Sequence, residues 1–113
     1  MGIEVIFIDL TNLENLRAAL KPNLKLVWLE TPTNPSMKVI DIRGVSEIVH
    51  KESKAVVVVD NTFLSPYFQR PLDLGADMVT YSLTKYMNGH ADVVMGSIAM
   101  NDEKIHETLK FYQ

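Results

Sequence analysis

A lysine flanked by small hydroxyl side chains lies downstream of an acid that ends an apolar run. Lys85 follows Ser82 and Thr84, and Asp60 follows four consecutive valines. An amine, an acid and hydroxyls together suit pyridoxal phosphate. The aldehyde of this cofactor reacts with an amine, its ring nitrogen pairs with an acid, and its phosphate accepts hydrogen bonds. The sequence therefore predicts a pyridoxal-phosphate site centred on Lys85.

Each of these four residues has its own expected role. Lys85 would bond to the cofactor's aldehyde, which requires a neutral amine, and would then move protons between substrate carbons. Asp60 would pair with the ring nitrogen and keep it protonated, which makes the ring a better electron acceptor. Ser82 and Thr84 alternate along the chain, so we expect their hydroxyls to share one face and to bind the phosphate.

Two further residues offer polar groups to the same site. Thr62 follows Asp60 by two positions and is expected to contact the phenolic oxygen of the ring. Asn34, in the proline-rich loop 31–35, offers an amide to that oxygen or to the substrate carboxylate. The candidate cofactor-binding residues are therefore Asn34, Asp60, Thr62, Ser82, Thr84 and Lys85, of which Lys85 is also the candidate catalytic residue.

Alternating strands and helices would position these residues. Apolar and β-branched runs predict strands at 3–8, 25–30, 55–60, 78–81 and 93–100. Capping residues and helical apolar spacing predict helices from Asn12 to about residue 21, from Asp41 to about residue 51, and after Asn101. This order is typical of the α/β class, with a mostly parallel sheet flanked by helices. Ligands bind such sheets at the carboxyl ends of the strands, where the candidate residues fall.

Composition and charge exclude several classes of function. The 113 residues allow one domain or less, and a net charge of −3 without a basic block gives no support to nucleic-acid or membrane binding. The chain has no cysteine, so disulfides and thiolate metal sites are excluded, and its three histidines are too scattered for a metal cluster. We expect no metal. No apolar run is long enough to span a bilayer, so we expect a soluble, cytoplasmic protein.

Simpler interpretations of the two key residues compete with a cofactor site. Taken alone, Lys85 could be a solvated surface lysine, and Asp60 could cap a turn or follow a nucleotide-binding strand. The nucleotide interpretation is disfavoured because the sequence contains no phosphate loop of the Gly-x4-Gly-Lys type. A cofactor site explains both residues together.

Longer strings in the sequence resemble the Cys/Met-metabolism family of pyridoxal-phosphate-dependent enzymes. These strings are residues 30–35, 58–63, 65–72, 81–86 and 86–96, and the resemblance extends over essentially the whole chain. It implies the aspartate-aminotransferase-like fold called fold type I. It also implies that residues 1–113 form part of the large pyridoxal-phosphate-binding domain, and that the family's N-terminal arm and C-terminal domain are absent from the chain.

The resemblance also implies a role for each candidate residue. Lys85 would be the Schiff-base lysine, Asp60 the partner of the pyridinium nitrogen, and Ser82 and Thr84 ligands of the phosphate. Asn34 and Thr62 would make additional contacts with the cofactor.

The implied activity is that of a carbon–sulfur lyase acting on a sulfur amino acid. Such an enzyme would cleave L-cystathionine by γ-elimination to cysteine, 2-oxobutanoate and ammonia, in transsulfuration and cysteine biosynthesis. The resemblance also implies a homo-oligomer, a tetramer, for the full-length parent enzyme. Two alternatives remain open: another family member that acts on methionine or makes cystathionine, and a truncated, non-catalytic remnant that keeps the fold or associates with subunits.

Overall fold

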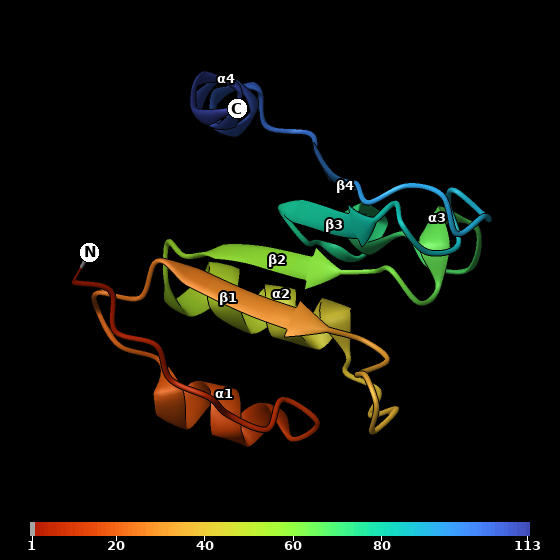
Figure 1. Ribbon diagram of the computed structural model, residues 1–113. Coiled ribbons are helices and arrows are strands. Elements are labelled where there is room, and N and C mark those ends of the chain that lie inside the picture. The colour runs from red at the N-terminus through yellow and green to blue at the C-terminus, as the bar shows by residue number, and fades with distance from the viewer. Residues whose placement is uncertain (1) are drawn as a thin grey trace.

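The computed structural model describes residues 2–113, which form a four-stranded sheet flanked by helices (Figure 1). The strands are ordered β1-β2-β3-β4 in the sheet; β1 pairs with β2 and β2 with β3 in parallel, whereas β4 is antiparallel to β3. The mostly parallel sheet predicted from the sequence is confirmed. In chain order the elements are α1 (Leu13–Ala19), β1 (Leu26–Glu30), α2 (Ile42–Glu52), β2 (Val56–Asp60), α3 (Ser65–Phe68), the 3-10 helix η1 (Pro71–Leu74), β3 (Met78–Ser82), β4 (Gly96–Met100) and α4 (Glu103–Tyr112).

The hydrophobic core lies between one face of the sheet and α2. Val57 and Val59 of β2 are fully buried, and they form one cluster with Val45 and Val49 of α2. Helix α1 packs against α2 and adds Leu16 to the same cluster. Figure 1 shows α2 behind β1 and β2, so the opposite face of these strands is turned to the viewer. Burial of this apolar surface is the main source of the fold's stability.

Polar side chains cap the N-termini of three helices. Asn12 accepts a hydrogen bond from Glu14 N at 3.0 Å and Asp41 accepts one from Gly44 N at 3.0 Å, which confirms both predicted caps. The predicted cap of the last helix, Asn101, is wrong by one residue. Asp102 caps α4 instead, and its carboxylate accepts from both Lys104 N and Ile105 N. A carboxylate at this position also interacts favourably with the positive end of the helix dipole.

Two predicted strands differ from the structure. Residues 3–8 form no strand, and Phe7 is 94% exposed. A strand needs a neighbour for its backbone hydrogen bonds, and the described sheet provides none for this segment. The last strand begins at Gly96 rather than at residue 93, because Met95 is already bonded to the turn that follows β3. None of the helices in residues 2–113 has the length and apolar character needed to cross a membrane.

Candidate active site at the carboxyl ends of the strands

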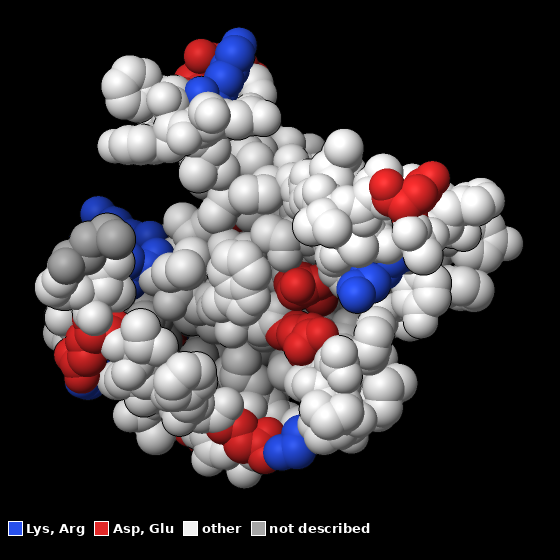
Figure 2. Space-filling view, viewed as in Figure 1, with Lys and Arg blue, Asp and Glu red and all other residues white. Residues whose placement is uncertain are grey.

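The three parallel strands end side by side at one edge of the sheet. Glu30, Asp60 and Ser82 are the last residues of β1, β2 and β3. Glu30 is paired in register with Asp60, and Asp60 with Thr80. Because side chains alternate along a strand, Glu30, Asp60, Thr80 and Ser82 all project from the face opposite α2. Figure 2 shows acidic side chains next to a basic one over this edge.

A short chain of hydrogen bonds holds the acid in place. Thr62 N donates to Asp60 Oδ1 at 3.0 Å, and Ser82 N donates to Thr62 Oγ1 at 2.8 Å. The Thr62 hydroxyl therefore joins the segment after β2 to the end of β3, and it keeps its own proton free to donate. The structure thus brings together Asp60, Thr62 and Ser82, three of the residues predicted from the sequence.

Lys85 lies one tight turn beyond this group. Its backbone N donates to Ser82 O at 3.1 Å, and its carbonyl accepts from Gly89 N at 3.1 Å. The residue is exposed, and among the described residues it forms no ion pair. The backbone of the lysine is fixed by the turn, while its amine stays accessible to a reactant above the sheet edge.

Thr84 has a different environment from Ser82. Strand β3 ends at Ser82, so Thr84 lies in the turn and the expected alternation of the two hydroxyls does not hold. The Thr84 hydroxyl accepts a bond from Met95 N at 3.0 Å and donates to Met95 O at 3.3 Å. In this arrangement Thr84 closes the segment between β3 and β4.

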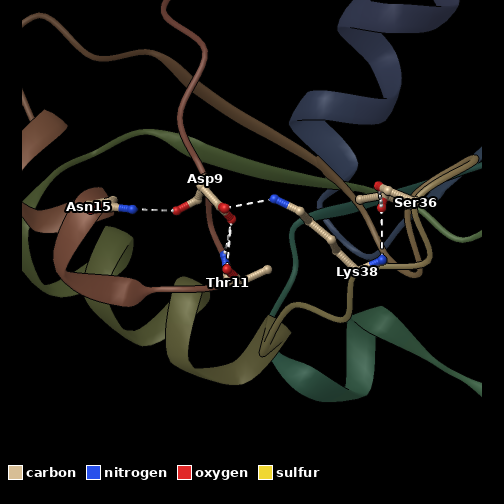
Figure 3. Close-up of polar contacts among 6 residues, drawn as sticks. Asp9, Thr11, Asn15, Ser36 and Lys38 are labelled. Carbon is tan, nitrogen blue, oxygen red and sulfur yellow. Dashed lines mark hydrogen bonds and ion pairs between the residues drawn. The ribbon is translucent and has the colours of Figure 1, made fainter.

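Asn34 lies in the exposed loop between β1 and α2, and among the described residues its side chain makes no hydrogen bond to the other candidates. An ion pair at the foot of this loop, from Lys38 Nζ to Asp9 Oδ2 at 2.7 Å, ties it to the N-terminal segment (Figure 3). The hydrogen bond from Lys38 holds the pKa of the Asp9 carboxyl well below its usual range, and Thr11 adds to this effect.

Two polar residues at this edge were not predicted from the sequence. The Thr80 hydroxyl is buried beside Asp60 without a hydrogen-bond partner in the described structure. The sequence pointed to Thr80 only through its position two residues before Ser82, which places both side chains on the same face of a strand. Asn61, fully buried directly after Asp60, gave no signal, because burial of an amide depends on the folded surroundings.

A cavity of about 400 Å³ lies elsewhere, between η1 and β4. It is lined mainly by apolar residues such as Pro71, Val79 and Ala99, and it contains none of the six candidate residues. The candidate site is instead the open face at the strand ends.

Comparisons with known proteins agree with this architecture. The family model of the Cys/Met metabolism PLP-dependent enzymes matches residues 1–113. The chain is 58% identical over 112 residues to human cystathionine gamma-lyase and 55% identical over 107 residues to that of Dictyostelium discoideum. These matches cover 99% and 95% of the chain but only 28% and 27% of the two relatives.

Solved structures give the same result. The apo crystal structure of CalE6 from Micromonospora echinospora, described as a methionine gamma lyase, superimposes with a TM-score of 0.94 and 49% identity over 98% of this chain and 30% of its own. A second crystal structure of CalE6, described as a cystathione gamma lyase, has the same TM-score. The sheet and its helices are thus part of a fold type I domain, and the chain belongs to the Cys/Met-metabolism family of pyridoxal-phosphate-dependent enzymes.

Proposed function

We propose that residues 1–113 form the lysine-bearing part of a pyridoxal-phosphate-binding domain, with Lys85 as the residue that bonds to the cofactor. Asp60 pairs with the ring nitrogen, and Ser82 binds the phosphate. The observation that carries this proposal is the hydrogen-bonded series Asp60–Thr62–Ser82 at the strand ends, with Lys85 one turn beyond. When bound, the cofactor supplies an electron sink for charge that develops on the substrate's α-carbon.

The polar groups at the sheet edge fit this cofactor. Thr62 N occupies one oxygen of Asp60, and in the described structure the other oxygen is free to accept from the ring nitrogen. The Ser82 hydroxyl has no partner among the described residues, so it has a proton to donate to the phosphate. Thr62 keeps a free hydroxyl proton and is proposed to donate it to the phenolic oxygen.

Two candidates require a change of partner or position. The Thr84 hydroxyl proton points to Met95 O, so Thr84 can donate to the phosphate only by exchanging this bond. Asn34 is proposed as a contact for the phenolic oxygen or the substrate carboxylate, from the loop after β1. Lys85, which is exposed above the edge, would take a proton from the substrate's α-carbon and then one from its β-carbon, so that the thiol can leave from the γ-carbon.

We propose the activity of a carbon–sulfur lyase that converts L-cystathionine and water to cysteine, 2-oxobutanoate and ammonia, in transsulfuration and cysteine biosynthesis. The 58% identity to human cystathionine gamma-lyase supports this substrate. A methionine-cleaving activity is the second candidate, supported by the 49% identity to CalE6, which is described as a methionine gamma lyase. For the parent enzyme we propose a cytoplasmic homotetramer; a non-catalytic remnant is the remaining alternative.

A labelling experiment tests the site. The purified chain is mixed with pyridoxal phosphate and reduced with borohydride, and the modified lysine is located by mass spectrometry. We expect one adduct at Lys85 that disappears in Lys85→Ala, while Lys54→Ala, a change at another exposed lysine, leaves it intact. Modification spread evenly over surface lysines would contradict the proposed site.

A product assay tests the activity. The chain with cofactor is supplied separately with cystathionine and with methionine, and 2-oxobutanoate is measured. Faster release from cystathionine supports the first candidate, and faster release from methionine supports the second. Absence of product from both, with Lys85 labelled, would indicate that this chain binds cofactor without turnover.

A further inference from the structure

A buried group of amides lies directly beneath the candidate site. The Asn61 side chain is fully buried, and its Nδ2 donates to Gln69 O at 2.7 Å, to Ser65 O at 3.1 Å and to the Tyr81 hydroxyl at 3.2 Å. Its backbone N also donates to Thr80 O at 3.0 Å. One residue thus joins the end of β2 to α3 and to β3.

Gln69 extends this group to the third strand. Its Nε2 donates to Asn61 Oδ1 at 2.9 Å and to Thr31 O at 3.1 Å, and Thr31 is the buried residue directly after β1. Both protons of the Gln69 amide are therefore used, one for the segment after β1 and one for the segment after β2. The ends of all three parallel strands are connected through these two side chains.

The candidate site residues are covalent neighbours of this group. Asn61 lies between Asp60 and Thr62 in the chain, and Tyr81 precedes Ser82. A shift of the Asn61 backbone would move the acid, and a shift of Tyr81 would move the serine. Because Asn61 is buried, it does not reach the open face itself, and it acts on the site only through its neighbours.

We propose that Asn61 and Gln69 are positioning residues, which hold Asp60 and Ser82 at the separation that the cofactor's ring nitrogen and phosphate require. This inference rests on the proposed function. Both amides bond to backbone carbonyls of other segments, because Asn61 Nδ2 donates to Gln69 O and Gln69 Nε2 donates to Thr31 O. They therefore specify one arrangement of the strand ends, because a shifted arrangement would leave buried donors and acceptors without partners.

Gln69→Leu is the variant that tests this role. Gln69 is only partly buried, so the fold is expected to survive its replacement. The change removes both donors and leaves Asn61 Oδ1 and Thr31 O buried without them. Ile48→Val, a small truncation in the core behind the sheet, is the control because it lowers global stability without touching these amides.

The first measurement is amide hydrogen exchange on the chain without cofactor. We expect Gln69→Leu to speed exchange about tenfold in residues 31–40 and 60–62, because a buried polar group that loses its partner destabilises its surroundings locally. Helices α1 and α4 should exchange at the wild-type rate. Unchanged exchange at 31–40 and 60–62, or an equal increase along the whole chain, would overturn the proposal.

The second measurement is the Kd for pyridoxal phosphate, followed by the fraction reduced onto Lys85. We expect the Kd to rise about tenfold in Gln69→Leu and to stay within about twofold of wild type in Ile48→Val. If local hydrogen exchange is faster in Gln69→Leu but its Kd equals that of wild type, the proposed positioning role of the two amides is overturned. Absence of labelling at Lys85 in the wild-type chain would overturn the proposed function. The connection between the strand ends is tested separately, because the hydrogen-exchange measurement uses the chain without cofactor.

Discussion

Replacement of Asp60 by asparagine separates the electrostatic role of this residue from its structural one. In the folded chain Asp60 Oδ1 accepts from Thr62 N at 3.0 Å, and an asparagine oxygen can accept the same bond. The free energy of unfolding should therefore change by less than about 0.5 kcal/mol. What Asp60→Asn removes is the negative charge that would face a protonated ring nitrogen.

The size of the effect follows from the exposure of the carboxylate. Hydrogen bonds to charged groups contribute about 1.5–3 kcal/mol, which corresponds to about 10- to 150-fold in affinity. Asp60 is only half-buried, so solvent weakens the pair and the lower end of this range applies. We expect the Kd for pyridoxal phosphate to rise about tenfold in Asp60→Asn.

The assay is a cofactor titration followed by absorbance, together with urea unfolding of the same samples. Asp73→Asn is the matched control, because Asp73 is an exposed acid on η1 away from the strand ends. It should bind cofactor like wild type. An Asp60→Asn chain that folds normally and binds as tightly as wild type would refute the assigned role of the acid.

Three further predictions concern stability. The pKa of Asp9 is lowered in the folded chain, so its ion pair with Lys38 stabilises the fold above the pKa of an unfolded aspartate, near pH 4, and this contribution is lost as the pH falls further. The urea midpoint of wild type should therefore approach that of Asp9→Asn between about pH 5 and about pH 2. A difference between the two midpoints that stays constant over this range would contradict the prediction. Leu16→Ala should lower the free energy of unfolding by about 2–5 kcal/mol because Leu16 is 2% exposed, whereas Leu26→Ala, at 47% exposed, should cost much less; equal losses would contradict the described core. Ser46→Ala should leave the free energy of unfolding unchanged or raise it by up to about 1 kcal/mol, measured by urea unfolding, because the buried Ser46 hydroxyl has no partner in the described structure; a clear loss of stability would contradict an unpartnered hydroxyl.

The parts of the fold that depend on local pattern were predictable. The β1 and β2 strands, the caps Asn12 and Asp41, and the buried face of α2 follow from runs of apolar residues and from their spacing. The direction of β4 was not predictable, because an apolar run does not specify which way a strand pairs. Residues 3–8 have strand-like composition, but strand formation also requires a neighbouring strand, and the local pattern does not show whether the fold provides one.

The candidate site was predictable to the extent that its residues follow strand ends. Asp60 and Ser82 lie at one edge because each ends a parallel strand, and on one face because Asp60 pairs with Thr80, two residues before Ser82. The environment of Thr84 could not be read from the sequence, because the strand stops two residues earlier than alternation would require. Asn61 was missed for a similar reason: its importance comes from contacts with Gln69 and Tyr81, which only the folded chain brings together.

The antiparallel direction of β4 has a consequence for how this segment can vary. Gly96, at the start of β4, pairs with Ser82, so the excursion between β3 and β4 leaves and returns at the same edge, and Thr84 and Met95 fasten its two ends. Residues added between Asp92 and Val94, beyond the bond from Gly89 N to Lys85 O that fixes the lysine, would lengthen only the outer part of this loop, and each doubling of its length would cost about 0.6 kcal/mol in closure entropy. Loop length can therefore diverge among homologues, or be changed by an engineer, while the backbone at Lys85 keeps its place.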